Sequence, residues 1–460
     1  MISRILQLLA SSIFARESRQ PKFLQLSFVG VLFGFGLYVW LFLLNYGHIS
    51  YTAYDWEHFY AFDRVLKDAI TQGKIPYFFS RQFQGTNQFL GHPETNLTPT
   101  IFLLNFLSIQ EYHVCNFMLI FGIGFWGCLL IKKQFDLSFF VFTVLFLIFN
   151  FNGYIVSHLL VGHLPWFGYY LLPFVILNVL TMIEGKNPYF IRNVSFTLFM
   201  MLLLGALHVF VITCMFLTLL VIFNVRFFSK ISQAMLWSVL LSLCKFIPAT
   251  VTFWHKEHPC RKGFMDIFMF IHSFFIHRPH DFFDWNGAYW HEYNYYIGIL
   301  GFIFIFYFGL IKRFGHLSQS HVFSEFDWPL LIMSFFAIGN CYSWIATLPI
   351  PLIDVERLPS RFVMIPLVIL TILASIRLQD VLDRVQILKV QFFWFFAFFY
   401  GACELLIQAG SWNLDILQRD PHFRNIVLVK PEIISIPQDS LYINAVNISV
   451  ILSLVALIAW

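Results

Sequence analysis

The chain has 460 residues, of which 59% are hydrophobic, 20% aromatic and only 12% charged, and its formal net charge at pH 7 is +4. Soluble domains are about 45–50% apolar and about 25% charged, so this composition excludes a soluble globular protein and indicates a polytopic membrane protein. The basic residues mostly cluster between apolar runs, and the small net charge does not indicate nucleic acid as a partner.

The seven cysteines are scattered along the chain, mostly inside apolar runs. They show neither a CxxC motif nor the Cys/His spacing of a zinc site. We therefore interpret them as small apolar residues and not as a disulfide or zinc framework.

Apolar runs long enough to cross a bilayer recur along the whole chain. A helix rises about 1.5 Å per residue and the hydrocarbon core is about 30 Å thick, so a span needs roughly 20 apolar residues. The sequence predicts an all-α integral membrane protein, with residues 1–460 as a single transmembrane domain. We count about twelve spans, within a range of about ten to thirteen, at 27–46, 113–131, 137–154, 164–183, 191–206, 207–225, 231–252, 295–311, 327–346, 362–378, 390–408 and 444–460.

The basic residues predict the orientation of these spans. Their clusters include Arg16, Lys132, Arg226, Lys312 and Arg384, and the positive-inside rule places each on the cytoplasmic side with every span crossing once. The N-terminus, which is basic and lacks a small-residue cleavage site, is then a cytoplasmic lead-in. The long polar loops, with short helices of their own, gather on the exoplasmic face, where we expect the functional site: 47–112, 253–294, 347–361 and 409–443.

The first exoplasmic loop brings two acids close to the membrane boundary. Asp55 and Glu57 follow the first apolar span by a few residues, and an ionisable group at that depth suggests a function. If 54–71 is helical, the two carboxylates diverge by about 200°, so Asp55 is the better single candidate. A lone carboxylate there could deprotonate an acceptor hydroxyl or help to hold a divalent cation. The alternative is that Asp55 is an ordinary helix N-cap.

The rest of that loop is punctuated by glycine and proline. A glycine and a proline at 73–76 end the expected helix, and residues 84–99 turn repeatedly and cannot form a regular helix. This stretch could line a cavity with His92, Glu94 and Asn96. It could equally cover the exoplasmic ends of the helices.

Two later loops carry arginines on the face that the positive-inside rule depletes of basic residues. Arg278 lies in a loop rich in histidine and aromatic residues, and Arg357 and Arg361 precede a span. Arginine can hold a phosphate through its bidentate fork, which suggests a lipid pyrophosphate in a groove. Pairing with nearby acids, or contact with headgroup phosphates, is the alternative. The six histidines from 255 to 291 show neither HxxxH nor HExxH spacing, so we do not expect a metal cluster there.

Four stretches in this order resemble the GT-C class of polytopic glycosyltransferases, and in particular the large bacterial membrane proteins of the YfhO type. They are an acid soon after the first span in Tyr54-Asp55-Trp56-Glu57, the turn and loop from Gly73 to Leu104, EYNYYIGILGFIF at 292–304, and AIGN...LP...ERLPSRF at 337–362. The last two stretches are the more specific. The chain is shorter than the usual YfhO-type proteins and lacks their C-terminal soluble domain.

The resemblance implies an enzyme that transfers a sugar from a polyprenyl-phosphate carrier to an acceptor on the exoplasmic face of a bacterial inner membrane. It implies a catalytic or metal-binding role for Asp55, with Glu57 second, and a divalent cation such as Mg²⁺ or Mn²⁺ is optional. It also places Arg357 and Arg361 at the carrier phosphate. Membrane lipids and further protein subunits are the other expected partners, and the remaining substrate-binding candidates are His92, Glu94, Arg278 and Glu292.

Two other classes of function remain open at this point. A lipid or solute transporter would place charges or broken helices within its spans, and the spans are mostly free of acids and lysine apart from Lys245 and Glu404. A non-catalytic subunit could keep the GT-C scaffold and serve in a larger assembly. Such a subunit would tolerate substitution of Asp55 and Arg361.

Overall fold

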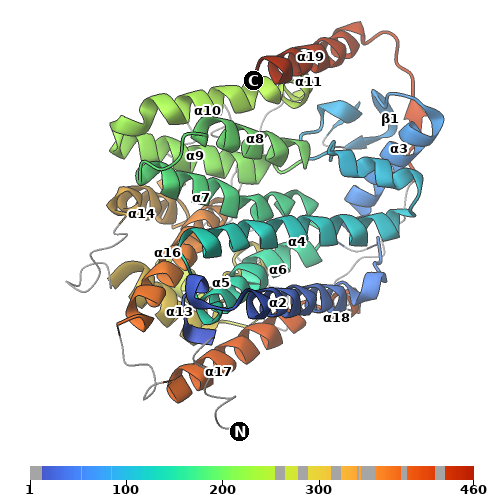
Figure 1. Cartoon of the computed structure of the whole chain (residues 1–460). Helices are drawn as coiled ribbons and strands as arrows, with labels where there is room; N and C mark the ends of the chain where they lie inside the picture. The colour runs from blue at the N-terminus through green and yellow to red at the C-terminus, as the bar shows by residue number, and fades with distance from the viewer. Residues whose placement is uncertain are drawn as a thin grey trace.

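The structure is a computed structural model that describes residues 13–52, 54–83, 85–253, 265–277, 289–311, 323–338, 341–342, 358–384, 391–419 and 430–460. Helices account for most of these residues, and one small sheet lies beside them (Figure 1). The expectation of an all-helical membrane protein is therefore confirmed. Arg278 and Arg357 lie outside the described residues.

Six helical stretches among the described residues are long and apolar enough to cross a membrane. Several consist of two consecutive helices. They are α2 (Lys22–Leu43), α4 (Ile109–Gln134), α5 and α6 (Phe139–Phe151 and Gly153–Leu160), η5 and α7 (Leu164–Leu171 and Leu172–Ile183), η11 and α16 (Pro359–Val363 and Met364–Leu382), and α19 (Ser440–Ala459).

The expectation of about twelve spans is wrong, because several apolar runs form helices that are too short or are bent. A seventh span arises only if η6 and α10 (Val225–Phe227 and Phe228–Leu241) are joined to α11 (Leu243–Phe253), and this pair is bent by 73°. The predicted spans 191–206 and 207–225 do separate at Gly205, which has a φ of +77°, but the two helices are shorter than a span requires. The shorter helices are α8 (Phe190–Leu203), α9 (Leu207–Phe223), α13 and η8 (Gly298–Phe304 and Ile305–Leu310) and α14 (Asp327–Phe336).

Burial separates central spans from peripheral ones. In an apolar 18-residue segment of Phe139–Leu160 and of Pro359–Leu382, 89% and 94% of the residues are buried, whereas the share is only 22% in each of Lys22–Leu43 and Ser440–Ala459. In a bilayer the outer pair would face lipid, which suits their mostly apolar surfaces. The helix α17 (Gln391–Gly410) also lies at the edge of the bundle (Figure 1).

One end of the bundle, here called the Arg16 face, collects ion pairs between basic residues and acids. Arg16 contacts Asp380 at 3.3 Å and also bonds Asp383, near the end of α16. Lys132, in the last turn of α4, lies 3.0 Å from Glu17. Basic residues predicted to share one side of the membrane therefore meet here. Which side of the membrane this is stays a prediction.

The opposite end, here called the Asp55 face, carries the first loop and the sheet. After α3 (Trp56–Gln72), Gly73 adopts a left-handed conformation with φ +63°, as expected of a residue that ends a helix. The strand β1 (Phe78–Phe83) pairs with β2 (Thr86–Gln88) and, on its other side, with β3 (Ile433–Ile434). The sheet thus ties the first predicted exoplasmic loop to the last one, 409–443, and lies beside α3 in Figure 1.

The remaining short elements also connect the longer helices. They are η1 (Glu17–Arg19), η2 (Asn45–Gly47), η3 (Phe89–Gly91), η4 (Pro99–Asn105), α12 (Ile267–His272), η7 (Trp290–Glu292), η10 (Ser324–Phe326) and α18 (Leu414–Gln418). Within the described part of 84–99 there is no α-helix, as the glycine and proline pattern predicted.

Candidate functional site

Acidic and histidine side chains from distant parts of the chain meet on the Asp55 face. Asp55 immediately precedes α3, His158 lies in the last turn of α6, and His163 lies in the turn between α6 and η5. Glu292 ends η7, and Arg361 lies in η11 at the start of a buried span. The sequence separates these residues by as many as 306 positions, from Asp55 to Arg361, and the fold brings them into one row of contacts.

The backbone around Asp55 is fixed against the turn that carries His163. The amide of Asp55 donates to the carbonyl of Val161 at 3.1 Å, and the indole of Trp56 donates to Leu160 at 3.0 Å. Gly162 has φ +89°, and a Cβ there would lie 2.7 Å from the Trp56 nitrogen, so only glycine fits. Tyr54, beside Asp55, also has positive φ, at +49°. Such backbone strain costs roughly 1–3 kcal/mol and is common at functional sites.

The Asp55 carboxylate is the accessible end of the cluster. Its side chain is 56% exposed, and one oxygen lies 2.9 Å from Nε2 of His163. The surrounding protein raises the pKa of Asp55, but the charge and hydrogen bond of His163, with the charges of His58 and His291, outweigh this and lower it to about 2. Asp55 occupies the N-cap position of α3 but makes no side-chain cap bond. The N-cap alternative is therefore wrong for its side chain.

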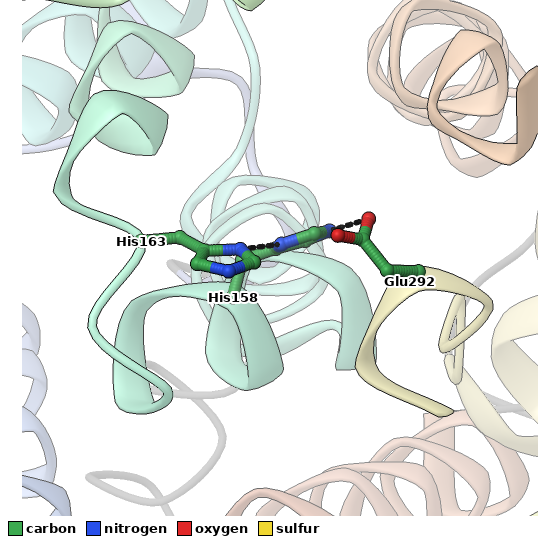
Figure 2. A group of neighbouring side chains, drawn as sticks. All are labelled: His158, His163 and Glu292. Carbon is green, nitrogen blue, oxygen red and sulfur yellow. Dashed lines mark hydrogen bonds and ion pairs between the residues drawn. The ribbon is translucent and has the colours of Figure 1, made fainter. Parts of the chain in front are cut away.

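A row of buried histidines continues from Asp55 into the protein. Nδ1 of His163 lies 2.8 Å from Nδ1 of His158, and Nε2 of His158 lies 3.6 Å from a Glu292 oxygen. Figure 2 shows the His158 ring between His163 and Glu292. One ligand atom from each of these three residues lies within 4.8 Å of the others, so among the described residues they are a group that could hold a metal ion.

The row ends in a buried ion pair. Nε and Nη2 of Arg361 donate to the two Glu292 oxygens at 2.8 and 2.6 Å. Burial raises the pKa of Glu292, but the charges of Arg361, His158 and His291 outweigh it, so the pKa is held well below its usual range. The Arg361 guanidinium also lies 5.3 Å from the centre of the Trp166 ring, in a cation–π arrangement. Arg361 and Glu292 are thus bonded to each other.

His291 lies beside this row. Its ring centre is 5.0 Å from that of His163 and 5.7 Å from that of His158, and its Nε2 lies 3.7 Å from Glu292. Burial lowers the pKa of His291 to about 3, with Glu292 opposing the shift. His291 is therefore neutral at neutral pH.

A second acid, Glu94, lies near the row on a rigid loop. Nζ of Lys245 donates to the carbonyl and hydroxyl of Thr95 at 2.6 and 2.8 Å. A Cβ at Gly205 would lie 2.2 Å from the Glu94 carbonyl oxygen, so the loop packs directly on that glycine. The carboxylate of Glu94 lies 3.7 Å from Nε2 of His208. Lys245, which the sequence places within a predicted span, thus holds the loop that carries Glu94.

Two of the predicted site residues have other partners. Glu57 is buried and forms a bidentate pair with Arg81, with one contact at 3.0 Å. His92 is buried among aromatic rings, including Phe83 at 5.1 Å and Phe62 at 5.5 Å between ring centres. The structure therefore bonds Glu292 to Arg361 and links Asp55 to this pair through His163 and His158. It gives Glu57 and His92 partners outside the row.

Sequence reasoning missed His158, His163 and His208. The first two lie five positions apart in SHLLVGH, at the junction of two predicted spans. The positive-inside rule places this short junction on the same face as Asp55. Their predicted position on the same face as Asp55 was therefore the signal that could have identified these two histidines. A search for histidines in the long loops alone does not include this junction.

Comparison of the chain with protein-family models, with curated proteins and with solved structures found no match. The case for a function accordingly depends on the site itself.

The stability contributed by Glu94 should depend on pH. Burial raises the pKa of Glu94, but the contact with His208 and the charge of His58 outweigh it and lower the pKa to about 2. The ionised form is thus favoured in the folded chain, so its contribution is complete above about pH 4.5 and is lost as the pH falls towards 2. The melting temperatures of detergent-purified wild type and Glu94→Gln should differ by a constant amount from pH 5 to 7. Below pH 5 this difference should become smaller as the pH falls.

The variant His208→Gln is the control for this experiment, because it removes the partner that lowers the pKa of Glu94. When Glu94→Gln is added to the His208→Gln background, the resulting difference in melting temperature should vary less with pH. A difference between wild type and Glu94→Gln that widens on acidification would contradict the prediction.

Proposed function

We propose that the chain is a membrane glycosyltransferase that moves a sugar from a polyprenyl-phosphate-linked donor to an acceptor hydroxyl on the Asp55 face. The observation that supports this best is the state of Asp55. Its carboxylate is 56% exposed and fixed by His163, and it begins a row of buried polar groups that leads to Arg361. An accessible, ionised and positioned carboxylate is what an acceptor hydroxyl requires.

The low pKa of Asp55, about 2, defines how it would act. Such a carboxylate is a weak base towards a free hydroxyl. It can still accept a hydrogen bond from the acceptor and orient its oxygen towards the anomeric carbon. The hydroxyl becomes acidic as the new C–O bond forms, and the proton passes to the carboxylate during that step. The bond from the sugar to the carrier phosphate breaks, and the phosphate leaves with its electron pair.

Cationic groups should stabilise the departing phosphate. Arg361 is predicted to do so, but its guanidinium forms two bonds to Glu292, and its side chain is 5% exposed. A donor phosphate would therefore have to share Arg361 with Glu292. Arg278 and Arg357 complete the predicted set and lie outside the described residues. The lipid phosphate is already a good leaving group, so positioning and charge neutralisation suffice.

The direct test is to look for the donor and its product. Purified full-length protein would be incubated with a polyprenyl-phosphate-linked sugar and an alcohol acceptor, and the released polyprenyl phosphate measured by mass spectrometry. We expect release that depends on the acceptor and on active protein. Co-purification of ordinary phospholipids alone, with no release above a heat-inactivated sample across several sugar donors, would contradict the proposal.

One observation favours a lipid transporter as the second candidate. The stretch Val225–Phe253 is bent by 73° at Ser242, and the buried Lys245 follows the bend. Broken helices with charged groups are common at transport sites. Here, however, Lys245 is bonded to the loop backbone near Glu94, which gives the charge a structural partner. Transport of an intact lipid-linked sugar across vesicles, with no release of carrier phosphate, would favour this alternative.

A further inference from the structure

We propose that His158, His163 and Glu292 bind a divalent transition-metal ion, such as Zn²⁺ or Mn²⁺, at the buried end of the row that starts at Asp55. This inference concerns binding and does not depend on the transfer reaction. Nothing in the sequence pattern indicated it, because the histidines come from a junction between spans and the glutamate from a loop 129 positions further on.

The donor atoms match this class of ion. Two imidazoles and one carboxylate each offer one atom, and these atoms lie within 4.8 Å of one another. Nitrogen and oxygen ligands at about 2.0–2.2 Å are typical of Zn²⁺, and they place neighbouring ligand atoms about 3.4 Å apart. Nε2 of His158 and the Glu292 oxygen are 3.6 Å apart, which is too long for a hydrogen bond and close to the spacing of two atoms that share an ion.

The hydrogen bonds along the row determine where lone pairs point. The carboxylate of Asp55 can only accept, so Nε2 of His163 donates to it, and Nδ1 is the nitrogen of this ring that could bind an ion. Without an ion, His158 donates from its Nδ1 to Nδ1 of His163 across the 2.8 Å contact, and its Nε2 lone pair faces the Glu292 carboxylate. When an ion binds, this hydrogen bond between the two rings has to break, so that the Nδ1 lone pair of His163 becomes the third ligand. Two electron-rich atoms that face each other in a buried place favour a cation between them.

Unsatisfied polar atoms at the same place support the inference independently. Within the described part of the chain, Nε2 of His158 and Nδ1 of His291 are buried and make no hydrogen bond. Both side chains are more than nine-tenths buried. Buried polar nitrogens without partners are costly and uncommon, and coordination would satisfy Nε2 of His158 directly.

The surrounding residues provide the supports that metal ligands usually have. A ligating histidine commonly donates its other ring N–H to a carboxylate, as His163 does to Asp55 at 2.9 Å. Arg361 fixes Glu292 by two bonds and leaves it lone pairs for an ion. With neutral histidines, Asp55, Glu292 and Arg361 together carry one net negative charge, so a divalent ion would be partly compensated.

Metal content provides the test. Full-length protein with a histidine-free affinity tag would be stripped with a chelator, incubated with Zn²⁺ or Mn²⁺, desalted and analysed by elemental mass spectrometry and thermal unfolding. We expect about one ion per chain and a raised melting temperature on adding metal. His158→Gln and His163→Gln should lose the ion and the shift. The control His113→Gln, which removes a buried histidine paired with Asp63 at 2.5 Å, should retain both.

The outcomes separate this inference from the proposed function. Equal metal content in wild type, His158→Gln and His163→Gln would mean an adventitious ion only and would overturn the inference. The inference would also be overturned if folded wild-type protein neither bound an ion nor gained stability when metal was added. Release of the carrier phosphate by metal-free protein would support the proposed function independently of the metal site. Metal binding without any sugar transfer would support the metal site and not the proposed function.

Discussion

Asp55→Asn is expected to reduce sugar transfer by about 10²- to 10⁴-fold, the usual contribution of a positioned acid or base, while the protein stays folded in the membrane. Asparagine keeps the shape of the side chain, and its oxygen can still accept from His163, but it cannot take a proton. Because the Asp55 side chain is 56% exposed, we expect little change in thermal stability. Single-turnover release of polyprenyl phosphate, measured beside the melting temperature, checks both parts.

Two control variants on the same helix make this result specific. Asp68→Asn removes a carboxylate that pairs with Arg64 at 3.2 Å, away from the row, and should leave transfer unchanged. Glu57→Gln breaks the buried bidentate pair with Arg81, so it should lower stability more than transfer. An Asp55→Asn protein that keeps full activity would exclude Asp55 from catalysis. Equal losses in all three variants would indicate a general structural effect.

The sequence predicted the class of fold but not the number of spans. Hydropathy identifies apolar runs, and each predicted run coincides at least partly with a helix, as α4 and α19 do. The break near Gly205 was predicted, but the helices on either side of it are shorter than a span requires, and the 73° bend near Ser242 was not predicted. A membrane helix can bend or end when neighbouring helices satisfy its backbone, and these contacts are not visible in a window of hydropathy.

The candidate site was predictable residue by residue only in part. Asp55 stood out because an isolated acid near a membrane boundary is costly without a role. The pairing of Glu292 with Arg361 joins positions 69 apart, and no local pattern reports such a contact. His158 and His163 were missed because a short junction between spans contains few polar residues. The pairing of Glu57 with Arg81 was not predicted either, since Arg81 lies on a strand that the sequence did not predict.

Arg361→Met is expected to lower the free energy of unfolding by about 3–5 kcal/mol, the usual cost of leaving one member of a buried ion pair without its partner. Both side chains of the Arg361 and Glu292 pair are only 5% exposed, so water cannot replace the lost guanidinium. The double variant Arg361→Met with Glu292→Gln should recover much of this loss, because it removes both charges together. Thermal and denaturant unfolding in detergent, arranged as a double-mutant cycle, measure the coupling.

Arg361→Lys separates the structural role of this residue from its predicted role at the donor phosphate. Lysine keeps the positive charge but cannot form the planar two-bond contact with Glu292, so we expect a smaller loss of stability than with methionine. If Arg361 also binds the donor phosphate, the lysine variant should bind the lipid-linked sugar more weakly while its chain remains folded. Full donor binding in Arg361→Lys, together with a strong coupling to Glu292 in the cycle, would assign Arg361 to support of the row alone. The cationic charge at the phosphate would then have to come from other residues of this face.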